Sequence, residues 1–289
     1  MHFLGIDAGA SATKWALICS EEVVASGIEE AMDGHIYRES SKKRMDQVLK
    51  KIADSTRGIA ISGAYLGITG VLHDGSIEQA LIKAFNASNT VVSDIELAYR
   101  ANFSQGEGIL LYAGTGSVAF AIDERNQIQQ IGGWGYLLGD EGAGFWIGRE
   151  SIRHSLSLIE SKQEIAAQSL AGLILAEIAA HDWNSVKTFV YSQERSAIAA
   201  LSKIVDGAAQ KGDQNAIEIL RRAANHLADL IHRIDKNLTR KALPVKFTGG
   251  ISGSHTLYSE LEKFLRMRVS ISTVDIARRA AELAAAGSL

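Results

Sequence analysis

The sequence of 289 residues contains only one cysteine, Cys19, and only one proline, Pro244. A single thiol cannot form an intramolecular disulfide or a thiolate metal cluster, so we expect the protein to work in a reducing cytoplasm. Cys19 is expected to be a small buried residue in a strand. Pro244 is expected at the first position of a strand, where its missing N–H is tolerated.

Long apolar runs and runs of like charge are also absent. The most apolar helical stretch, residues 169–180, is too short to cross a bilayer, and the first residues lead directly into a predicted strand. We therefore expect no signal peptide and no membrane partner. The net charge is −3, without five like charges in a row, which argues against nucleic acid as the main partner.

Short apolar runs alternate with segments that carry apolar residues at helical spacing. Strands are expected at residues 3–7, 14–18, 23–28, 59–68, 90–93, 108–113, 118–123, 128–132, 243–248 and 269–271. Helices are expected at residues 41–55, 77–85, 95–103, 163–181, 195–211, 213–237, 255–265 and 274–286.

The pattern of strand, small-residue turn, strand and strand occurs at the start of the chain and begins again near residue 108. It predicts an α/β protein with two domains, residues 1–106 and residues 107–274, the second with a helical insertion. The closing segment, residues 275–289, could pack back on the first domain.

The first turn contains small and hydroxyl-bearing residues between two strands. A turn without bulky side chains lets backbone N–H groups approach phosphate oxygens, and Gly9 lies at its centre. Ser11 and Thr13 could add hydroxyl donors and Lys14 a positive charge, while Asp7 could hold a hydrated magnesium ion. An ordinary hairpin turn is the alternative interpretation, and the P-loop pattern is absent.

The second turn, Gly114, Thr115, Gly116 and Ser117, has the same character and the same alternative interpretation. Because similar turns open two similar halves, the sequence favours a nucleotide held between the domains by one phosphate-binding turn from each.

Three further segments are candidates for ligand binding. Residues 132–144 hold six glycines, a density that indicates close backbone approach to a ligand. Asp94 lies where a predicted strand ends and a helix begins, so it is either an N-cap or a functional carboxylate. Gly249 and Gly250 follow a predicted strand, in a turn that suits a nucleoside but is common in α/β loops.

Taken in order, these segments resemble the N-acetylglucosamine kinase branch of the actin-like ATPase superfamily, over essentially the whole chain. The most specific segment is GGWGYLLGDEGAGFWIG, followed by GTGS and VVSD. The resemblance implies two ribonuclease-H-like domains with a nucleotide cleft between them. It also implies ATP and Mg²⁺ as cofactors, a homodimer, and transfer of phosphate to an amino sugar, with N-acetylglucosamine 6-phosphate as the foremost product.

The resemblance also assigns roles to residues. Asp94 corresponds to the aspartate that takes the proton from the sugar hydroxyl. The first phosphate motif falls on Asp7, Gly9 and Ser11, the second on Thr115, the sugar-binding stretch on Gly133, Trp134, Gly135 and Asp140, and the adenosine motif on Gly249 and Gly250.

The chain departs from the family pattern at three places. The three glycines of the first motif are replaced by Ala8-Gly9-Ala10, and the asparagine that often follows GTGS is replaced by Val118. An Asn-His pair that grips the sugar is represented by Gly34 and His35. Ser117, Val118 and His35 are therefore candidate substrate contacts, and glucosamine or another hexose is an alternative substrate.

Three other functions remain as alternatives. An ATPase that activates a partner enzyme would hold an iron–sulfur cluster through several cysteines, which Cys19 alone cannot do. A non-catalytic sugar sensor would have no need for the aspartates at positions 7, 94 and 140. A glucokinase of the repressor-related type usually has a Cys/His zinc site, whereas the eight histidines here are scattered.

Overall fold

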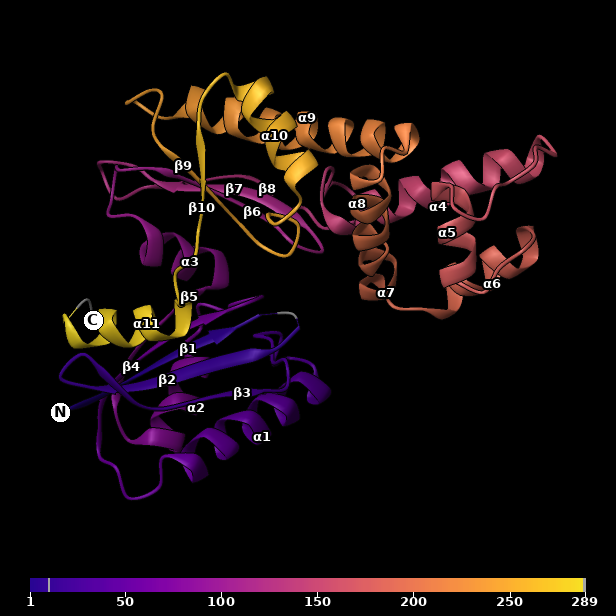
Figure 1. The fold of residues 1–289 in the computed structure, drawn as a ribbon. Helices are drawn as coiled ribbons and strands as arrows, with labels where there is room; N and C mark the ends of the chain where they lie inside the picture. The colour runs from indigo at the N-terminus through magenta and orange to yellow at the C-terminus, as the bar shows by residue number, and fades with distance from the viewer. Residues whose placement is uncertain (10, 288–289) are drawn as a thin grey trace. The chain divides into compact units, whose positions relative to one another are not determined.

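The computed structural model describes residues 1–9 and 11–287 (Figure 1). The chain divides into two compact units, which are described separately. Unit 1 consists of Met1–Phe103 and Thr273–Leu289, and unit 2 of Ser104–Ser272. These boundaries lie two or three residues from those expected from the sequence, and the closing helix belongs to unit 1.

Unit 1 is built on a sheet with the strand order β3-β2-β1-β4-β5. Its strands are β1 (His2–Ala8), β2 (Thr13–Cys19), β3 (Glu22–Glu29), β4 (Ile61–Ile68) and β5 (Ser88–Ser93). The first three form an antiparallel meander, whereas β4 runs parallel to β1 and β5 parallel to β4. The hairpin between β1 and β2 closes with a hydrogen bond from Gly9 N–H to Ala12 O (3.1 Å), and it sets Asp7 opposite Lys14.

Helices cover both faces of the unit 1 sheet. They are α1 (Glu39–Ser55), α2 (Ser76–Phe85), α3 (Asp94–Asn102) and α11 (Ile276–Ala285). Alternate residues of β1 point to opposite faces, so Leu4 and Ile6 pack with α1 and α2. Gly5 faces α11, where a Cβ would lie 2.0 Å from Ala277 O. The absence of that Cβ lets α11, drawn yellow, lie directly on the indigo strands (Figure 1).

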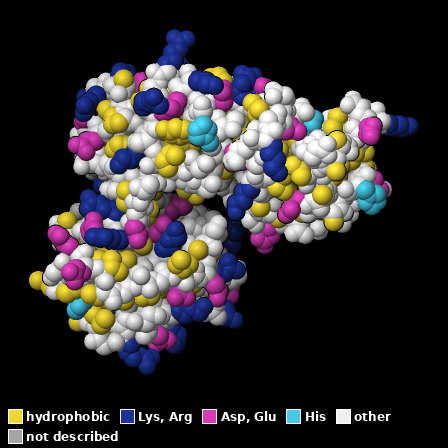
Figure 2. Space-filling view, viewed as in Figure 1, with side chains coloured by type: hydrophobic (Ala, Val, Ile, Leu, Met, Phe, Trp, Pro, Cys, Tyr) yellow, Lys and Arg dark blue, Asp and Glu magenta, His cyan; other side chains and the backbone are white. Residues whose placement is uncertain are grey.

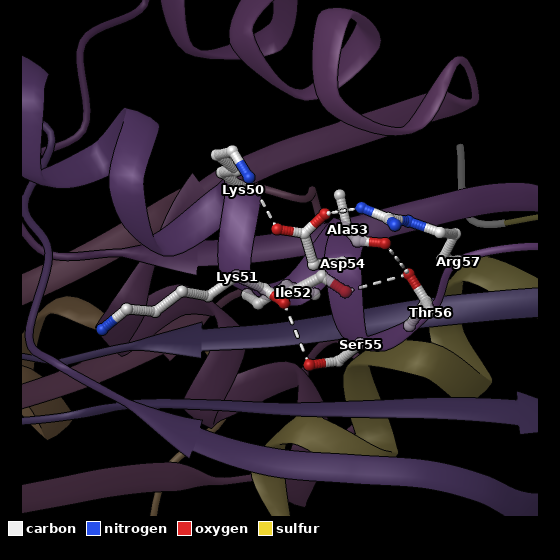
Figure 3. A network of polar contacts seen from close by, with 8 residues as sticks. All are labelled: Lys50, Lys51, Ile52, Ala53, Asp54, Ser55, Thr56 and Arg57. Carbon is white, nitrogen blue, oxygen red and sulfur yellow. Dashed lines mark hydrogen bonds and ion pairs between the residues drawn. The ribbon is translucent and has the colours of Figure 1, made fainter.

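The end of α1 is held by its own side chains (Figure 3). The buried Thr56 hydroxyl donates to Ile52 O (3.0 Å), which also accepts from Thr56 N–H (3.0 Å), so the hydroxyl is satisfied at the helix end. Asp54 pairs with Lys50 (2.7 Å) and Arg57 (2.6 Å) at the surface. Exposed pairs of this kind contribute little to stability, so the Thr56 hydrogen bond is the more important of these contacts.

Unit 2 repeats the sheet plan of unit 1. Its strand order is β10-β9-β6-β7-β8, with β6 (Ile109–Ala113), β7 (Ser117–Ile122), β8 (Ile128–Gly132), β9 (Val245–Thr248) and β10 (Val269–Ile271). Again the first three strands form an antiparallel meander and the last two run parallel to the first. Both units therefore have the same sheet plan, as the repeated sequence pattern predicts, and it is the ribonuclease-H-like sheet that the family resemblance implies.

The helices of unit 2 lie mostly between β8 and β9 in sequence. They are α4 (Gly144–Glu160), α5 (Leu170–Glu177), α6 (Trp183–Ser192), α7 (Arg195–Ala200), α8 (Ser202–Gln210) and α9 (Gln214–Asn237), with α10 (His255–Leu265) after β9. Helix α9 presents a buried apolar face that includes Ala224, Leu227 and Ile231. It contacts β6, β7 and β8 and so covers the sheet beside the glycine-rich loop.

Some local predictions were wrong. The helix expected at 163–181 begins only at Leu170, because the Ser169 side chain caps it by accepting from Gly172 N–H (3.2 Å). The helix expected at 195–211 is divided at Leu201 into α7 and α8. Cys19 is half-buried instead of buried, and Pro244 precedes β9, where its carbonyl accepts from Ile109 N–H (2.9 Å).

Charged side chains of both signs are interspersed over the face shown in Figure 2. Among the described residues, no helix has the length and apolar character required to cross a membrane.

Candidate functional site

Asp7 lies near the carboxyl end of β1, on the face of the sheet that α11 covers. It lines a cavity of about 460 Å³ within unit 1, together with Lys14, Trp15, Ile28, Val274 and Asp275. Burial raises the pKa of Asp7 to about 6, and the neighbouring Asp94 and Asp275 carboxylates add to the rise, while Lys14 opposes it. A carboxylate in such surroundings would be stabilised by a bound cation.

The residues of the first turn differ in how accessible they are. Ser11 and Lys14 are exposed, and a Cβ on Gly9 would meet only Ala12 O at 3.6 Å. Packing within the chain therefore does not require glycine at position 9. The approach of a ligand to the backbone would explain why glycine is there. Thr13 is wholly buried, and its hydroxyl has no hydrogen-bond partner within the described residues. A phosphate could reach that hydroxyl only if the hairpin moved. Ala10 lies outside the described residues.

Asp94 is the first residue of α3 but not its cap. The N-cap is Ser93, whose hydroxyl accepts from Glu96 N–H at 3.2 Å. Asp94 instead accepts from the Thr69 hydroxyl through Oδ2 (2.6 Å) and from Ile95 N–H through Oδ1 (3.0 Å). The N-cap interpretation of Asp94 is therefore wrong, and its carboxylate is held at the end of β5 by a residue from the end of β4.

His35 lies on the loop between β3 and α1. Its Nδ1 is 2.9 Å from Asp33 Oδ1, which also accepts from the His35 backbone N–H at 3.0 Å. Burial would raise the pKa of Asp33, but hydrogen bonds from His35 and Ser41 outweigh it and hold that pKa below its usual value. The imidazole ring lies over Gly70, where a Cβ would approach His35 Cε1 to 2.4 Å.

These groups converge because parallel strands end at the same edge of a sheet. The carboxyl ends of β1, β4 and β5 bring together Ala8, Thr69 and Asp94: Thr69 N–H donates to Ala8 O (3.1 Å), and its hydroxyl donates to Asp94. Gly34 N–H donates to Thr69 O (2.8 Å) and ties the loop that carries His35 to the same point. This edge of unit 1 can offer a proton acceptor and hydrogen-bonding groups to a polyhydroxylated ligand.

In unit 2, the Gly114–Ser117 turn is pinned to the segment that precedes α4. Gly144 N–H donates to Gly114 O (2.8 Å), and the Ser117 hydroxyl donates to Glu141 O (3.0 Å). Asp140 is buried at φ +65°, and its Oδ1 accepts from Ser117 N–H at 3.1 Å. Burial raises the pKa of Asp140, whereas the Ser117 N–H and the Arg195 charge lower it.

The position of Asp140 changes the interpretation of two predicted residues. Asp140, which we expected to bind the sugar, accepts from Ser117 N–H and so supports the turn that is predicted to bind phosphate. A Cβ on Gly116 would lie 2.6 Å from Asp140 Oδ2. Gly116 is therefore required by packing within unit 2, whatever it binds. Thr115 is partly exposed, and its carbonyl accepts from Phe145 N–H at 3.2 Å.

The glycine-rich loop after β8 exposes large apolar side chains. Trp134, Leu137 and Leu138 are 60%, 79% and 76% exposed. Gly132, Gly133 and Gly135 have φ values of +81°, +71° and +83°, which side chains rarely adopt and which turn the loop outward. The guanidinium of Arg233 lies 5.6 Å from the Trp134 ring centre.

Val118 packs beneath the same loop. A Cβ on Gly133 would lie 3.3 Å from Val118 Cγ2, and the valine is only 8% exposed. Its isopropyl group thus packs mainly against other residues of unit 2 and offers little surface to a ligand.

The predicted adenosine turn contains two glycines with different requirements. Gly249 has φ +104°, and a Cβ there would lie 2.3 Å from Ala113 O at the end of β6. Among the described residues, nothing lies within 4 Å of a Cβ placed on Gly250. Packing against β6 therefore requires glycine at position 249. It does not require glycine at position 250, where the space beside the sheet edge is open to a ligand.

The family model described as the BadF/BadG/BcrA/BcrD ATPase family matches residues 4–287. The chain belongs to this family. The N-acetylmuramic acid/N-acetylglucosamine kinase of Clostridium acetobutylicum is 26% identical over 281 residues, with 92% of this chain and 90% of that protein covered. The N-acetyl-D-glucosamine kinase of Dictyostelium discoideum is 26% identical over 274 residues, with 86% and 84% covered.

A solved structure from Chromobacterium violaceum, provisionally named an N-acetylglucosamine kinase, has the same fold as this family member. It superposes with a TM-score of 0.78 at 21% identity and covers 98% of each chain. The family relationship and this fold confirm the expected architecture of two actin-like ATPase domains.

Sequence reasoning missed three residues of this BadF/BadG-family chain. Thr69 holds Asp94, Asp33 holds His35, and Asp275 lines the cavity beside Asp7. Thr69 directly follows a predicted strand, and Asp33 directly precedes the Gly34-His35 pair, so both positions carried a usable signal. Asp275 is distant in sequence and reaches Asp7 only because α11 packs against β1.

Proposed function

We propose that this chain is an ATP-dependent kinase that phosphorylates an amino sugar, foremost N-acetylglucosamine to its 6-phosphate. The observation that carries the proposal is the environment of Asp94. Its carboxylate is not used as a helix cap and is oriented by the Thr69 hydroxyl at the edge where β1, β4 and β5 end. Both curated relatives are named as kinases that act on N-acetylglucosamine, which supports the same substrate class here.

The proposed chemistry needs little from the protein beyond position and charge. In phosphoryl transfer, the protein mainly aligns the attacking hydroxyl with the γ-phosphate and neutralises charge. We assign Asp94 to accept the hydroxyl proton as the new P–O bond forms and the bond from the γ-phosphorus to ADP breaks, a contribution to the rate of about 10²–10⁴-fold. We assign Gly9, Ser11, Lys14 and Thr115 to the phosphates, and Gly250 to the adenosine.

Magnesium fits the residues that are present. Mg²⁺ usually keeps several waters and binds through one or two carboxylates plus substrate phosphates. Asp7 is a half-buried carboxylate that lines a cavity, and among the described residues no group of three or more His, Cys, Asp or Glu side chains is arranged to hold a metal by itself. We therefore propose that Asp7 holds Mg²⁺ through water. The ion would neutralise charge on the phosphates.

We assign His35 and the glycine-rich loop around Trp134 to the sugar. Exposed aromatic rings provide an apolar platform with a polar edge, which suits the face of a sugar. Asp140 and Val118 are buried, so we assign them to support of this loop and of the Ser117 turn. Because Val118 offers almost no surface to an acetyl group, glucosamine and other hexoses remain the alternative substrates.

A coupled assay for ADP release across N-acetylglucosamine, glucosamine, glucose and other hexoses tests this proposal. We expect sugar-dependent ADP release that is highest with N-acetylglucosamine. ATP hydrolysis that is independent of every sugar would favour an ATPase that drives a partner enzyme, and sugar binding without turnover would favour a sensor. We further propose a cytoplasmic homodimer, for which light scattering measures the mass in solution.

A further inference from the structure

The Asp33 carboxylate is fixed by three hydrogen bonds. Its Oδ1 accepts from the His35 backbone N–H (3.0 Å) and lies 2.9 Å from His35 Nδ1, while its Oδ2 accepts from the Ser41 hydroxyl (3.1 Å). Ser41 is buried in the first turns of α1, so the carboxylate is anchored to a helix. The hydrogen bond at one imidazole nitrogen decides which nitrogen carries the proton. In the neutral imidazole, a carboxylate at Nδ1 places the proton there and leaves a lone pair at Nε2.

The His35 ring is held against the end of β4. Gly34 N–H donates to Thr69 O (2.8 Å), and the ring covers Gly70, whose φ of +70° and missing Cβ make room for it. Thr69 is also the residue whose hydroxyl holds Asp94. The side chain of His35 is 37% exposed, so a ligand at this edge can reach the ring.

Gly34 cannot carry a polar side chain in this backbone. A Cβ there would lie 2.4 Å from Gly70 O, which is a backbone atom and cannot swing away. The asparagine expected beside the histidine is therefore excluded from this loop. His35 is left as the side chain of the pair that can contact a ligand, and its orientation depends on Asp33.

We propose that Asp33 is a positioning residue for the sugar: it fixes the Nδ1–H tautomer of His35, so that Nε2 accepts a hydrogen bond from a sugar hydroxyl. This inference rests on the proposed function. It predicts discrimination against a sugar that lacks this hydroxyl, because a site built to receive a hydroxyl rejects such a sugar. Asp33 itself does not touch the sugar.

Enzyme kinetics with five variants test the proposal. Asp33→Ala should raise the KM for the sugar at least about 10-fold, the effect of one lost hydrogen bond, with the KM for ATP within about twofold. Asp33→Asn, whose amide oxygen can still accept from Nδ1–H, should restore most of the loss. Ser41→Ala is the matched control, since it removes a hydrogen bond from Asp33 but leaves the contact with His35. In a His35→Ala background, Asp33→Ala should raise the KM for the sugar little further.

The ¹⁵N chemical shifts of the His35 ring provide a readout that does not depend on turnover. We expect Nδ1–H in the wild-type protein and in Asp33→Asn, and a mixture of tautomers in Asp33→Ala. If Asp33→Ala leaves the tautomer unchanged, Asp33 only supports the loop. The same conclusion would follow if Asp33→Ala raised the KM for the sugar equally in the wild-type and His35→Ala backgrounds. If the wild-type protein phosphorylates no sugar, the proposed function fails. If it does, and Asp33→Ala keeps a normal sugar KM, only this inference fails.

Discussion

The Thr69 hydroxyl donates to Asp94 Oδ2 at 2.6 Å and joins the ends of β4 and β5. The backbone of Thr69 is fixed in turn by Ala8 O, which accepts from its N–H at 3.1 Å. The candidate base is thus oriented by a residue that is itself part of the sheet hydrogen bonding.

Thr69→Val should keep the shape of the side chain and remove this donor. A hydrogen bond to a charged group is worth about 1.5–3 kcal/mol, so we expect kcat to fall about 10- to 100-fold while the KM for ATP stays within about twofold. Thr69→Ser keeps the hydroxyl and should retain most of the activity. Equal kcat values for the valine and serine variants would remove Thr69 from the catalytic account.

Gly9→Ala separates ligand binding from packing. The added Cβ meets only Ala12 O, at the ordinary contact distance of 3.6 Å, so we expect the melting temperature to change little. It would obstruct the approach of phosphate to the backbone, so ATP affinity, measured by calorimetry, should fall at least about 10-fold. Gly207→Ala in α8 is the control, since nothing lies within 4 Å of that Cβ. Unchanged ATP affinity in Gly9→Ala would mean that the turn is only a hairpin.

The neighbouring glycines of the proposed adenosine turn should respond in opposite ways. Gly249→Ala combines φ +104° with a 2.3 Å approach to Ala113 O, so we expect a loss of about 2 kcal/mol or more in the free energy of unfolding. Gly250→Val should change stability by less than about 1 kcal/mol but weaken ATP binding. Normal ATP affinity in a stable Gly250→Val variant would place the adenosine elsewhere.

Asp7→Asn should lose activity and gain stability. The pKa of Asp7 rises from 3.8 to about 6 on folding, which corresponds to about 3 kcal/mol at 1.36 kcal/mol per unit. Because the folded state binds this proton more tightly, stability falls as the pH rises from about 4 to about 6 and is constant above that. The asparagine side chain of the variant does not ionise, so the variant avoids this loss of stability.

Urea unfolding without metal or nucleotide measures the difference. Asp7→Asn should be more stable than the wild-type protein by about 3 kcal/mol near pH 7.5 and by about half as much near pH 5. A stability difference that does not depend on pH would show that Asp7 is not strained by its burial and its acidic neighbours.

Much of the fold could be predicted from the sequence because its signals are local. The strands that begin at His2, Thr13 and Ile109 are short apolar runs bounded by small-residue turns, and both sheets repeat one plan. The segment before α5 could not be predicted from apolar spacing alone. There the Ser169 cap overrides a helical pattern that continues on both sides.

The site was predicted less completely, since its contacts join distant segments. Asp94 could be found from its place at a strand end, but not Thr69 as its partner, because strand pairing creates that contact. Asp140 and Gly116 had the residue types of a ligand site. The structure adds that Asp140 accepts from Ser117 N–H and fills the space beside Gly116, a packing role that residue type alone does not reveal.

The central claim is that Asp94 is the proton acceptor in phosphate transfer to a sugar, and steady-state kinetics of Asp94→Asn test it most directly. Asparagine keeps the size of the side chain and can still accept from Thr69, so the fold and ATP affinity should be retained within a few-fold. We predict a fall in kcat of at least about 10² with N-acetylglucosamine. A kcat within about threefold of the wild-type value would contradict the account.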